Sequence, residues 1–307
     1  MNIALIGSTG LIGSEIYSHL RNSHSITTFG RNSQNDKHLD VSSIKSIESL
    51  ELKNYDVIIH AAGVTDEQFK ENPEKAFHQG TYCTSTLMKQ AIKSNVKKII
   101  YFSTAHVYGT FKSQILESTP PNPLSAYSTS HYSTEQLMKG ITMGTETSCL
   151  VVRPNAVFGI PPNLKSFNRW GLIPYSFPLE GITKNKITLK SAGVQKRNFI
   201  STSDLAKYVK FYLDESKTFG NFHIINPIGP ESISIREFAQ KCCDFISKNT
   251  GTKCEVNIEA KHNKDIYDDN FEYQTIYKKF KCKDTTDNYL TKIIPMIKAL
   301  NNEQTRR

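Results

Sequence analysis

The N-terminal part of the chain runs from a short apolar segment directly into a glycine-rich turn. Residues 3–6 are Ile-Ala-Leu-Ile, and Gly7, Gly10 and Gly13 follow at the start of an amphipathic segment, Leu11–Leu20. A tight strand-to-helix turn needs glycine, and so does close approach of the backbone to a pyrophosphate. The helix N-terminus then offers unpaired N–H groups to phosphates. The turn predicts a dinucleotide site, although its spacing is not the common Gly-x-Gly-x-x-Gly and such turns also serve plain packing of a helix on a strand.

The first half of the chain alternates short apolar runs with segments of helical periodicity. The runs are rich in β-branched residues, as strands buried on both faces are. They cover residues 3–6, 26–29, 57–59, 99–102 and 150–152. Helical spacing of apolar residues occurs in Leu11–Leu20 and in 76–94. This alternation predicts an α/β fold, a doubly wound parallel sheet of the Rossmann type.

The pattern changes after Arg153. Residues 154–200 are rich in proline and glycine and lack periodicity, which predicts irregular loops with short strands such as Lys186–Leu189. Helices are predicted at 204–213 and at 234–246, the second with Ser234 and Glu237 as a capping box, and a strand at 221–225. We expect residues 1–153, with 199–226 returning to them, to form the dinucleotide-binding domain. Residues 154–198 and 227–307 would form a smaller C-terminal substrate-binding lobe.

Composition excludes several classes of protein. Of the 307 residues 38% are hydrophobic, enough for a sizeable core, and no apolar run reaches the roughly 18–20 residues of a membrane span. The start, MNIALIGSTG, does not have the pattern of a secretion signal, so we expect a cytoplasmic protein. Six cysteines without a Cys-x-x-Cys pair read as reduced, buried thiols, and we expect no metal site.

The chain is basic, with a formal net charge of +9. A basic surface suits either nucleic acid or small phosphorylated ligands. The lysines and arginines are scattered in short clusters and form no long stripe. We therefore expect phosphorylated small molecules as ligands, and neither nucleic acid nor membrane as a partner.

The choice and binding of the cofactor depend on two residues that follow the second predicted strand, Arg31 and Asp40. Arg31 stands where an acidic residue would accept hydrogen bonds from an adenosine ribose, and a guanidinium suits a ribose 2′-phosphate. We expect NADP, with NAD as the alternative, unless Arg31 is simply a surface residue. Asp40, followed by Val41, would either bond an adenine amine or cap the next helix.

A third group of polar residues follows a later strand. Thr104 lies just beyond the run 99–102, at the end of the strand where ligands of such sheets bind. Tyr127 and His131 are four residues apart in a predicted helix and so share one face. If Tyr127 lies beside Thr104, the two hydroxyls could polarise a carbonyl and transfer a proton to it.

Together these segments resemble one family, the extended short-chain dehydrogenases/reductases that act on sugar nucleotides as NAD(P)-dependent epimerases, dehydratases and reductases. The similar segments occur in family order over roughly residues 1–240. They are 7–13, 57–63, 102–109, 127–131, 151–159, 197–200 with Asp204-Leu205, and 234–238. The resemblance implies an enzyme, a nucleotide-sugar substrate and a homodimer.

The resemblance also implies which residues form the site. Thr104, Tyr127 and His131 would be catalytic. His106, Asn155 and Arg197 would contact the substrate. The residues expected to bind the cofactor are Gly7, Thr9, Gly10, Leu11, Ile12, Gly13, Arg31, Asp40, Val41, Ala61, Ala62, Gly63, Tyr127, His131 and Pro154.

This chain departs from the family pattern at several positions. The family has Tyr-x-x-x-Lys, whereas here His131 replaces the lysine, a charged group that lowers the tyrosine pKa. Free histidine titrates near ~6.5 and free lysine near ~10.4, so His131 would support a tyrosinate only if a neighbour kept it protonated. Ala105-His106 replaces the acid pair of the dehydratases, which disfavours dehydration. His106 would face the sugar or be structural, and His60 is expected to be structural.

Three functions stay open from the sequence. The first is NADPH-dependent reduction of a nucleotide-linked 4-keto sugar, with Tyr127 as proton donor and Thr104 holding the carbonyl oxygen. The second is a sugar-nucleotide epimerase that holds NAD tightly. The third is a catalytically weak nucleotide-binding protein, which the His131 replacement favours and the intact Thr104 and Tyr127 oppose.

Overall fold

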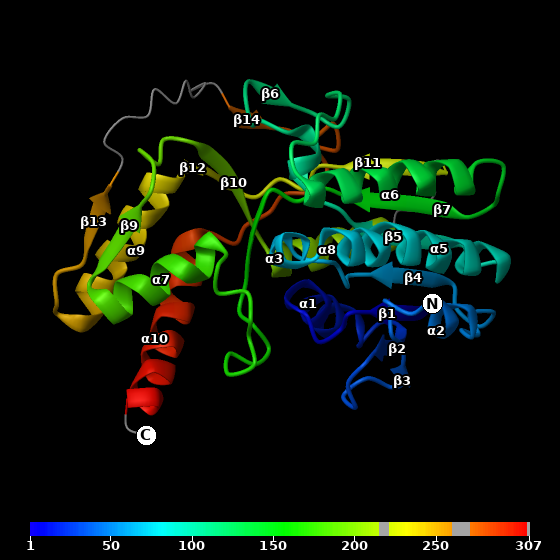
Figure 1. The fold of residues 1–307 in the computed structure, drawn as a ribbon, viewed down its shortest axis with the longest axis horizontal. Helices are drawn as coiled ribbons and strands as arrows, with labels where there is room; N and C mark the ends of the chain where they lie inside the picture. The colour runs from blue at the N-terminus through cyan, green and yellow to red at the C-terminus, as the bar shows by residue number, and fades with distance from the viewer. Residues whose placement is uncertain (215–220, 260–270, 306–307) are drawn as a thin grey trace.

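The computed structural model describes residues 1–214, 221–259 and 271–305, and its largest element is a seven-stranded parallel sheet (Figure 1). The strand order is β11-β7-β5-β4-β1-β2-β3, and every pairing in it is parallel. The strands are β1 (Asn2–Ile6), β2 (Ser25–Gly30), β3 (Lys37–His38), β4 (Val57–His60), β5 (Lys98–Phe102), β7 (Ser148–Val152) and β11 (Phe222–Ile225). The predicted doubly wound parallel sheet is confirmed.

Helices cover both faces of this sheet, which explains why its strands read as continuous apolar runs. On one face, α1 (Leu11–Leu20) and α8 (Thr202–Asp214) pack on alternate residues such as Leu5 and Ile59. On the other face, α2 (Ile44–Glu48), α5 (Thr84–Lys93) and α6 (Ala126–Thr142) pack on the residues between them, such as Ile6 and Ile58. Within the described residues, none of the helices combines the length and apolar character that a membrane span requires.

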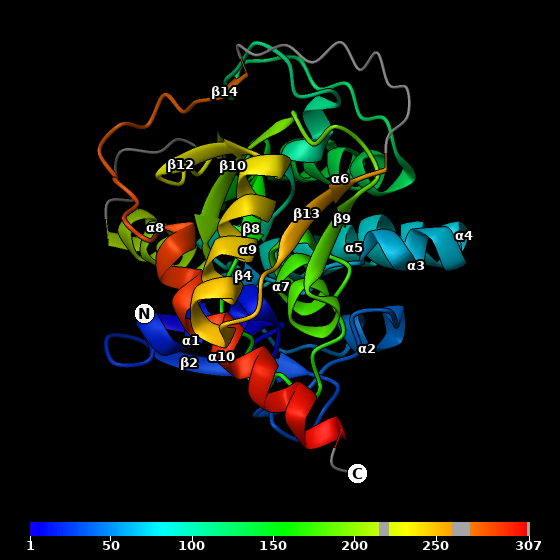
Figure 2. The same cartoon turned by 90° about the vertical axis from the view of Figure 1, so that its left-hand side faces the viewer.

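A second group of elements forms a lobe beside the sheet (Figure 2). It contains β8 (Ala156–Phe158), β10 (Lys196–Ser201) and β12 (Glu231–Ser234) in one small sheet, and β9 (Lys186–Leu189) with β13 (Glu255–Ile258) in another. Its helices are α7 (Ile173–Lys184), α9 (Ile235–Thr250) and α10 (Thr286–Thr305). Leu11, at the start of α1, packs against the core of this lobe, so the lobe stands at the carboxyl ends of the sheet strands.

Within residues 154–200, predicted as irregular loops with short strands, the strand Lys186–Leu189 is confirmed, but helix α7 was not predicted, and neither was α10. Helix α7 has Pro174 in its first turn and Pro178 inside, and α10 contains Pro295. Because proline disfavours the interior of a helix, the sequence did not indicate a helix at either place. Both bury apolar residues in the lobe core, among them Tyr175 and Ile293. The capping box of α9 is confirmed, with Ser234 accepting from the backbone N–H of Glu237.

The helical segment predicted over 76–94 is confirmed, but it is not one regular α-helix. The chain forms α4 (Pro73–Phe77), then the π-helical segment η1 (His78–Cys83), and then α5. A Cβ atom on Gly80 would come within 2.8 Å of the Ser130 hydroxyl oxygen, so glycine permits η1 to lie directly against α6. The hydroxyl of Thr81 also bonds to the Ser130 carbonyl across this contact. The wide turn thus places η1 beside the helix that carries Tyr127.

A buried ion pair joins three elements next to the end of the sheet. Glu135 on α6 accepts from the Arg153 guanidinium, which follows β7, with Nε 3.0 Å from Oε1. The Ser103 hydroxyl, which follows β5, donates to the same carboxylate. The side chains of Arg153 and Glu135 are 1% and 0% exposed. Since both charges are out of water, each depends on the other for its stability.

We predict that Glu135→Gln strongly destabilises the fold, because it leaves the buried Arg153 charge without its carboxylate. The expected loss in the free energy of unfolding is about 3–5 kcal/mol. The matched control is Glu146→Gln, which removes an exposed ion pair with Lys97 and should change the stability little, because water screens exposed charges. Denaturant unfolding measures both. Equal effects of the two variants would contradict the role given to the buried pair.

Candidate active site

The glycine turn after β1 leaves no room for side chains. Gly7 has φ +89°, and a Cβ atom there would lie 2.7 Å from the backbone nitrogen of Ala62. A Cβ atom on Gly13 would lie 2.1 Å from the carbonyl oxygen of Gly7. Two of the glycines are therefore required by the close contact of turn, helix and the segment after β4.

The start of α1 fits a phosphate group. Gly10 is the N-cap of this helix, no side chain caps it, and its first turn carries no acidic residue. The first-turn N–H groups, in the stretch where Leu11, Ile12 and Gly13 were predicted to bind the cofactor, have no acceptor within the helix. Thr9 is exposed in the same turn. This is the cradle that a dinucleotide pyrophosphate would need.

The other predicted cofactor residues lie around this turn. Ala61, Ala62 and Gly63 follow β4 and lie against it, and Arg31 is exposed just after β2. Asp40 accepts from the backbone and the hydroxyl of Ser42, and these bonds, helped by Arg31, hold the pKa of its carboxyl below the ordinary value. The alternative that Asp40 caps the next helix is wrong, because Ser43 is the N-cap of α2.

Tyr127 and Thr104 meet where β5 ends and α6 begins. Thr104 is buried and caps the short 3-10 segment η2 (Ala105–Tyr108). Ser125 caps α6 through a capping box and so fixes its first turn, which carries Tyr127. Burial raises the pKa of Tyr127, while the charge of Arg169 and a hydrogen bond with the Thr104 side chain oppose the rise. The phenol is therefore protonated at neutral pH, which suits a proton donor.

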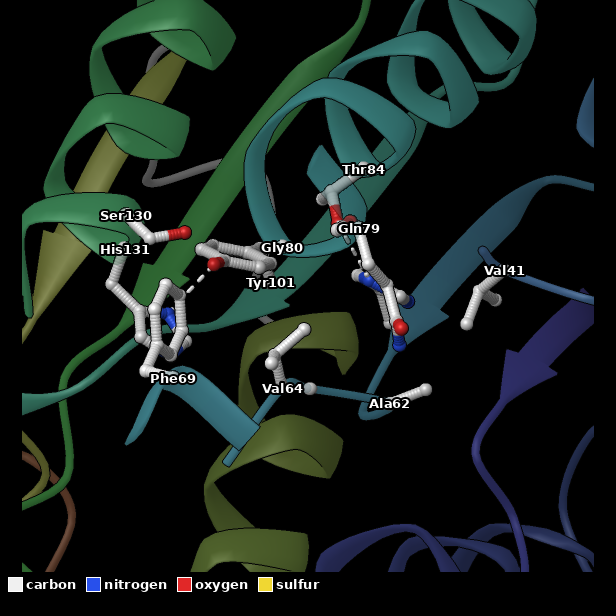
Figure 3. A pocket seen from close by; sticks show the side chains of 12 residues that line it. Val41, Ala62, Val64, Phe69, Gln79, Gly80, Thr84, Tyr101, Ser130 and His131 are labelled. Carbon is white, nitrogen blue, oxygen red and sulfur yellow. Dashed lines mark hydrogen bonds between the residues drawn. The ribbon is translucent and has the colours of Figure 1, made fainter. Parts of the chain in front are cut away.

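His131 lies one turn further along α6 and is buried. Its ring centroid is 4.6 Å from that of Tyr127, and its Nδ1 is 2.7 Å from the Tyr101 hydroxyl on β5 (Figure 3). Burial, followed by the nearby His60 and His106, lowers the pKa of His131 to about 3. A neutral imidazole therefore stands where the resemblance expected a charged lysine.

Tyr101 and His60 were not predicted as part of the site. The two rings stack with centroids 6.0 Å apart, and burial lowers the pKa of His60 to about 4. His60 Nε2 contacts the Thr84 hydroxyl, while Nδ1 is buried without a partner among the described residues. Both side chains line a small cavity that Figure 3 shows. It is lined by Val41, His60, Ala62, Gly63, Val64, Phe69, Gln79, Gly80, Thr84, Tyr101, Ser130 and His131.

The predicted substrate residues lie on the lobe side of Tyr127. The rings of His106 and Tyr127 have centroids 6.4 Å apart, and His106 also packs on Phe111 at 5.3 Å. The Arg197 guanidinium stacks on the same Phe111 ring, 4.7 Å from its centroid. Desolvation, together with the charge of Arg197, lowers the pKa of His106. The structure thus brings His106 and Arg197 to one side of the proposed proton donor.

Pro154 and Asn155 complete the site from β7. The Pro154 carbonyl accepts from the backbone N–H of Ala105, which ties the end of β7 to the segment after Thr104. Both amide atoms of Asn155 are buried and have no hydrogen-bond partner in the described part of the chain. Buried polar groups are nearly always paired, so this amide points to a ligand that is polar. Among the described residues no group of three or more His, Cys, Asp or Glu side chains is arranged to hold a metal ion.

Comparison with known proteins shows which family this chain matches. The family model described as "NAD dependent epimerase/dehydratase family" matches residues 3–227. Among curated proteins, the UDP-glucose 4-epimerase of Vibrio cholerae is 24% identical over 81% of this chain and 77% of its own length. The dTDP-D-glucose 4,6-dehydratase of Mus musculus is 25% identical over 51% of this chain. The chain spans 43% of that dehydratase and 59% of a probable UDP-arabinose 4-epimerase from Arabidopsis thaliana.

Solved structures share the fold at low sequence identity. UDP-glucuronic acid 4-epimerase from Bacillus cereus, in complex with UDP-glucuronic acid and NAD, superposes with a TM-score of 0.79 at 18% identity. That comparison covers 98% of this chain and 100% of the other. RMD from Pseudomonas aeruginosa, complexed with NADPH, has a TM-score of 0.77 at 16% identity, covering 97% and 99% of the two chains. This chain and the two solved structures therefore share one arrangement of sheet and lobe.

We predict that His131 makes the stability of the protein depend on pH. Its folded pKa is lowered, so the unfolded chain binds the proton more readily and stability is lost as pH falls from about 6.5 towards 3. His131→Gln should remove one proton from this linkage and reduce the slope of unfolding free energy by about 1.4 kcal/mol per pH unit near pH 5. The control is His38→Gln at an exposed position. An unchanged slope in His131→Gln would show that the imidazole is charged in the folded protein.

Proposed function

Because the chain belongs to the NAD dependent epimerase/dehydratase family, we propose that it catalyses NADPH-dependent reduction of a nucleotide-linked 4-keto sugar. The observation that carries this proposal is the electrostatic environment of Tyr127. The partly buried Tyr127 has a raised pKa, and its neighbour on α6 is the neutral His131. A site of this kind keeps the proton on the tyrosine, ready to be donated.

The direction of the reaction follows from that proton. Reduction of a ketone needs an acid that protonates the developing alkoxide, whereas oxidation of an alcohol needs a base that removes a proton. A tyrosinate base would need a lowered pKa. The neutral imidazole provides no cation, and the charge of Arg169 only reduces the rise in the Tyr127 pKa that burial causes, so the phenol keeps its proton. Tyr127 is therefore the general acid, and the Thr104 hydroxyl holds the carbonyl oxygen beside it.

The cofactor would lie along the carboxyl ends of β1, β2 and β4. The first-turn amides of α1 would hold the pyrophosphate, and Arg31 the 2′-phosphate of NADP. The Nε2 atom of His131 would donate to or accept from the nicotinamide ribose, since Nδ1 is used by Tyr101. When bound, the reduced dinucleotide supplies the hydride. Asp40 and Val41 would lie near the adenine, and Pro154 near the nicotinamide.

The substrate would lie between the sheet and the lobe. The Arg197 guanidinium suits the nucleotide diphosphate, and the unpaired amide of Asn155 and the ring of His106 suit sugar hydroxyls. The dinucleotide-binding part would comprise residues 1–153 with 199–226, and the substrate lobe residues 154–198 with 227–307. Residues 215–220, 260–270 and 306–307 of these parts lie outside the described residues. A homodimer and a cytoplasmic location stay predictions.

An NAD-dependent 4-epimerase is the second candidate. Its support is that several relatives bear that name. Such an enzyme first oxidises its substrate, so Tyr127 would have to act as a base with only a neutral histidine next to it on α6. A 4,6-dehydratase is disfavoured because Ala105 and His106 stand after Thr104, where dehydratases have acids.

The proposed reaction predicts consumption of NADPH with nucleotide-linked 4-keto sugars. Tyr127→Phe should lower kcat by about 100-fold or more, because the general acid is lost. Tyr82→Phe, at an exposed position on η1, is the matched control and should keep its activity. Loss of NADPH absorbance and product analysis give the readout. If dinucleotide co-purifies and a nucleotide sugar is inverted at one carbon without net oxidation, the epimerase is correct and the proposal fails.

Arg31 predicts the choice of cofactor. Arg31→Ala should weaken NADPH binding by about 10–100-fold, the value of a lost charge-assisted hydrogen bond, and leave NADH binding unchanged. The control is Arg21→Ala, an exposed arginine at the end of α1. Isothermal titration measures both affinities. A wild-type protein that prefers NADH would overturn the NADP assignment.

A further inference from the structure

Donation of the proton leaves a negative charge on Tyr127, and the lysine that α6 carries, Lys139, lies in the last turn of the helix, at the far end from Tyr127. The neutral His131 occupies the place of the family lysine. Arg153 is committed to the buried carboxylate of Glu135, and Arg197 stacks on Phe111 and acts on His106. Arg169, which comes from the lobe, is a further arginine, and its charge acts on the phenol.

The loop that carries Arg169 is anchored on both sides. Next to it in the chain, the ring of Phe167 packs on Tyr175 of α7 at 4.5 Å and on Trp170 at 5.3 Å. On the other side the loop meets α3 (Asp66–Glu71), since a Cβ atom on Gly171 would lie 3.5 Å from the Glu67 carboxylate. The loop is thus held between the lobe core and α3.

Helix α3 also touches the proposed acid. Phe69 meets the Tyr127 ring edge to face, with centroids 6.1 Å apart. One short helix therefore contacts both Tyr127, through Phe69, and the Arg169 loop, through Glu67. A hydrogen bond with its own backbone is the main cause of the lowered pKa of Glu67, and the charge of Arg169 adds to it. Burial raises the pKa of Tyr127, and the charge of Arg169 opposes that rise.

The Arg169 guanidinium has a hydrogen-bond donor without an acceptor among the described residues. That donor is its Nε, which is buried. A guanidinium stays charged at every pH at which a protein is folded, unlike an imidazole. Its charge therefore does not depend on the state of His131.

We propose that Arg169 supplies, from the lobe, the positive charge that stabilises the Tyr127 phenolate once its proton has been donated. The lysine of the family both binds the ribose and supplies a positive charge. In this chain His131 would form the hydrogen bond to the ribose, and Arg169 would supply the charge. Arg169 acts as a positioning and electrostatic residue, and the inference rests on the proposed role of Tyr127. Because the cation comes from the lobe, the strength of the acid depends on how the lobe loop sits over the site.

The test measures the ionisation of Tyr127 directly and needs no substrate. Tyr127 is replaced by 3-fluorotyrosine, which ionises at lower pH than tyrosine, and its fluorine NMR signal is followed during a pH titration. Arg169→Gln should move the midpoint upwards by about one pH unit. Arg169→Lys, which keeps the positive charge, should leave the midpoint close to its wild-type value. The matched control is Lys165→Gln, which removes an exposed cation from the same loop and should leave the midpoint unchanged.

A second variant links Arg169 to the lysine position. His131→Lys added to Arg169→Gln should return the midpoint to the wild-type value or below. If the midpoint stays unchanged in Arg169→Gln while affinity for a nucleoside diphosphate falls, Arg169 is a diphosphate ligand and the inference is wrong. If the midpoint moves as expected but no keto sugar is reduced, the inference stands and only the proposed reaction fails.

Discussion

The ion pair between Glu135 and Arg153 holds the proposed active site together. Its members lie on α6 and just after β7, and the Ser103 hydroxyl adds the end of β5. Each is next to a residue of the site: Ser103 precedes Thr104, Arg153 precedes Pro154 and Asn155, and Glu135 lies one turn from His131. A buried pair that is fully bonded allows little freedom of movement. The pair thereby fixes how α6 lies across the ends of β5 and β7, which are neighbouring strands of the sheet.

The same burial determines the electrostatics of the site. Packing α6 and η1 against β5 removes His131 and His60 from water, and both lose the tendency to carry a proton. Tyr127 responds in the opposite direction, since its charged form is the anion, and it holds its proton more strongly. The site therefore contains a neutral acid and neutral imidazoles, while its positive charges come from the side of the lobe, from Arg197 and Arg169.

Sequence patterns predicted the parts of the fold that depend on local periodicity. The sheet strands, α1 and the capping box of α9 follow from apolar spacing and cap residues. Helices α7 and α10 could not be predicted in this way, because Pro174, Pro178 and Pro295 mask them and their apolar faces make sense only against each other. Strand ends and helical spacing placed Thr104 at a strand end and Tyr127 with His131 on one helical face, and the resemblance implied that Thr104 and Tyr127 belong to one site. The contact of Tyr101 with His131 did not follow from such patterns, since it depends on how α6 lies across β5, and Arg169 lies in a loop without periodicity.

The central claim is that Tyr127 donates a proton in a net reduction. Isotope transfer tests it most directly: the protein is given reduced dinucleotide with deuterium at the transferable position, together with a nucleotide-linked 4-keto sugar. The account predicts one deuterium in each product molecule and one oxidised dinucleotide per turnover. The account is contradicted if the keto sugar stays unreduced and the added dinucleotide unoxidised, while a nucleotide sugar with a 4-hydroxyl group is inverted at C4 without added dinucleotide.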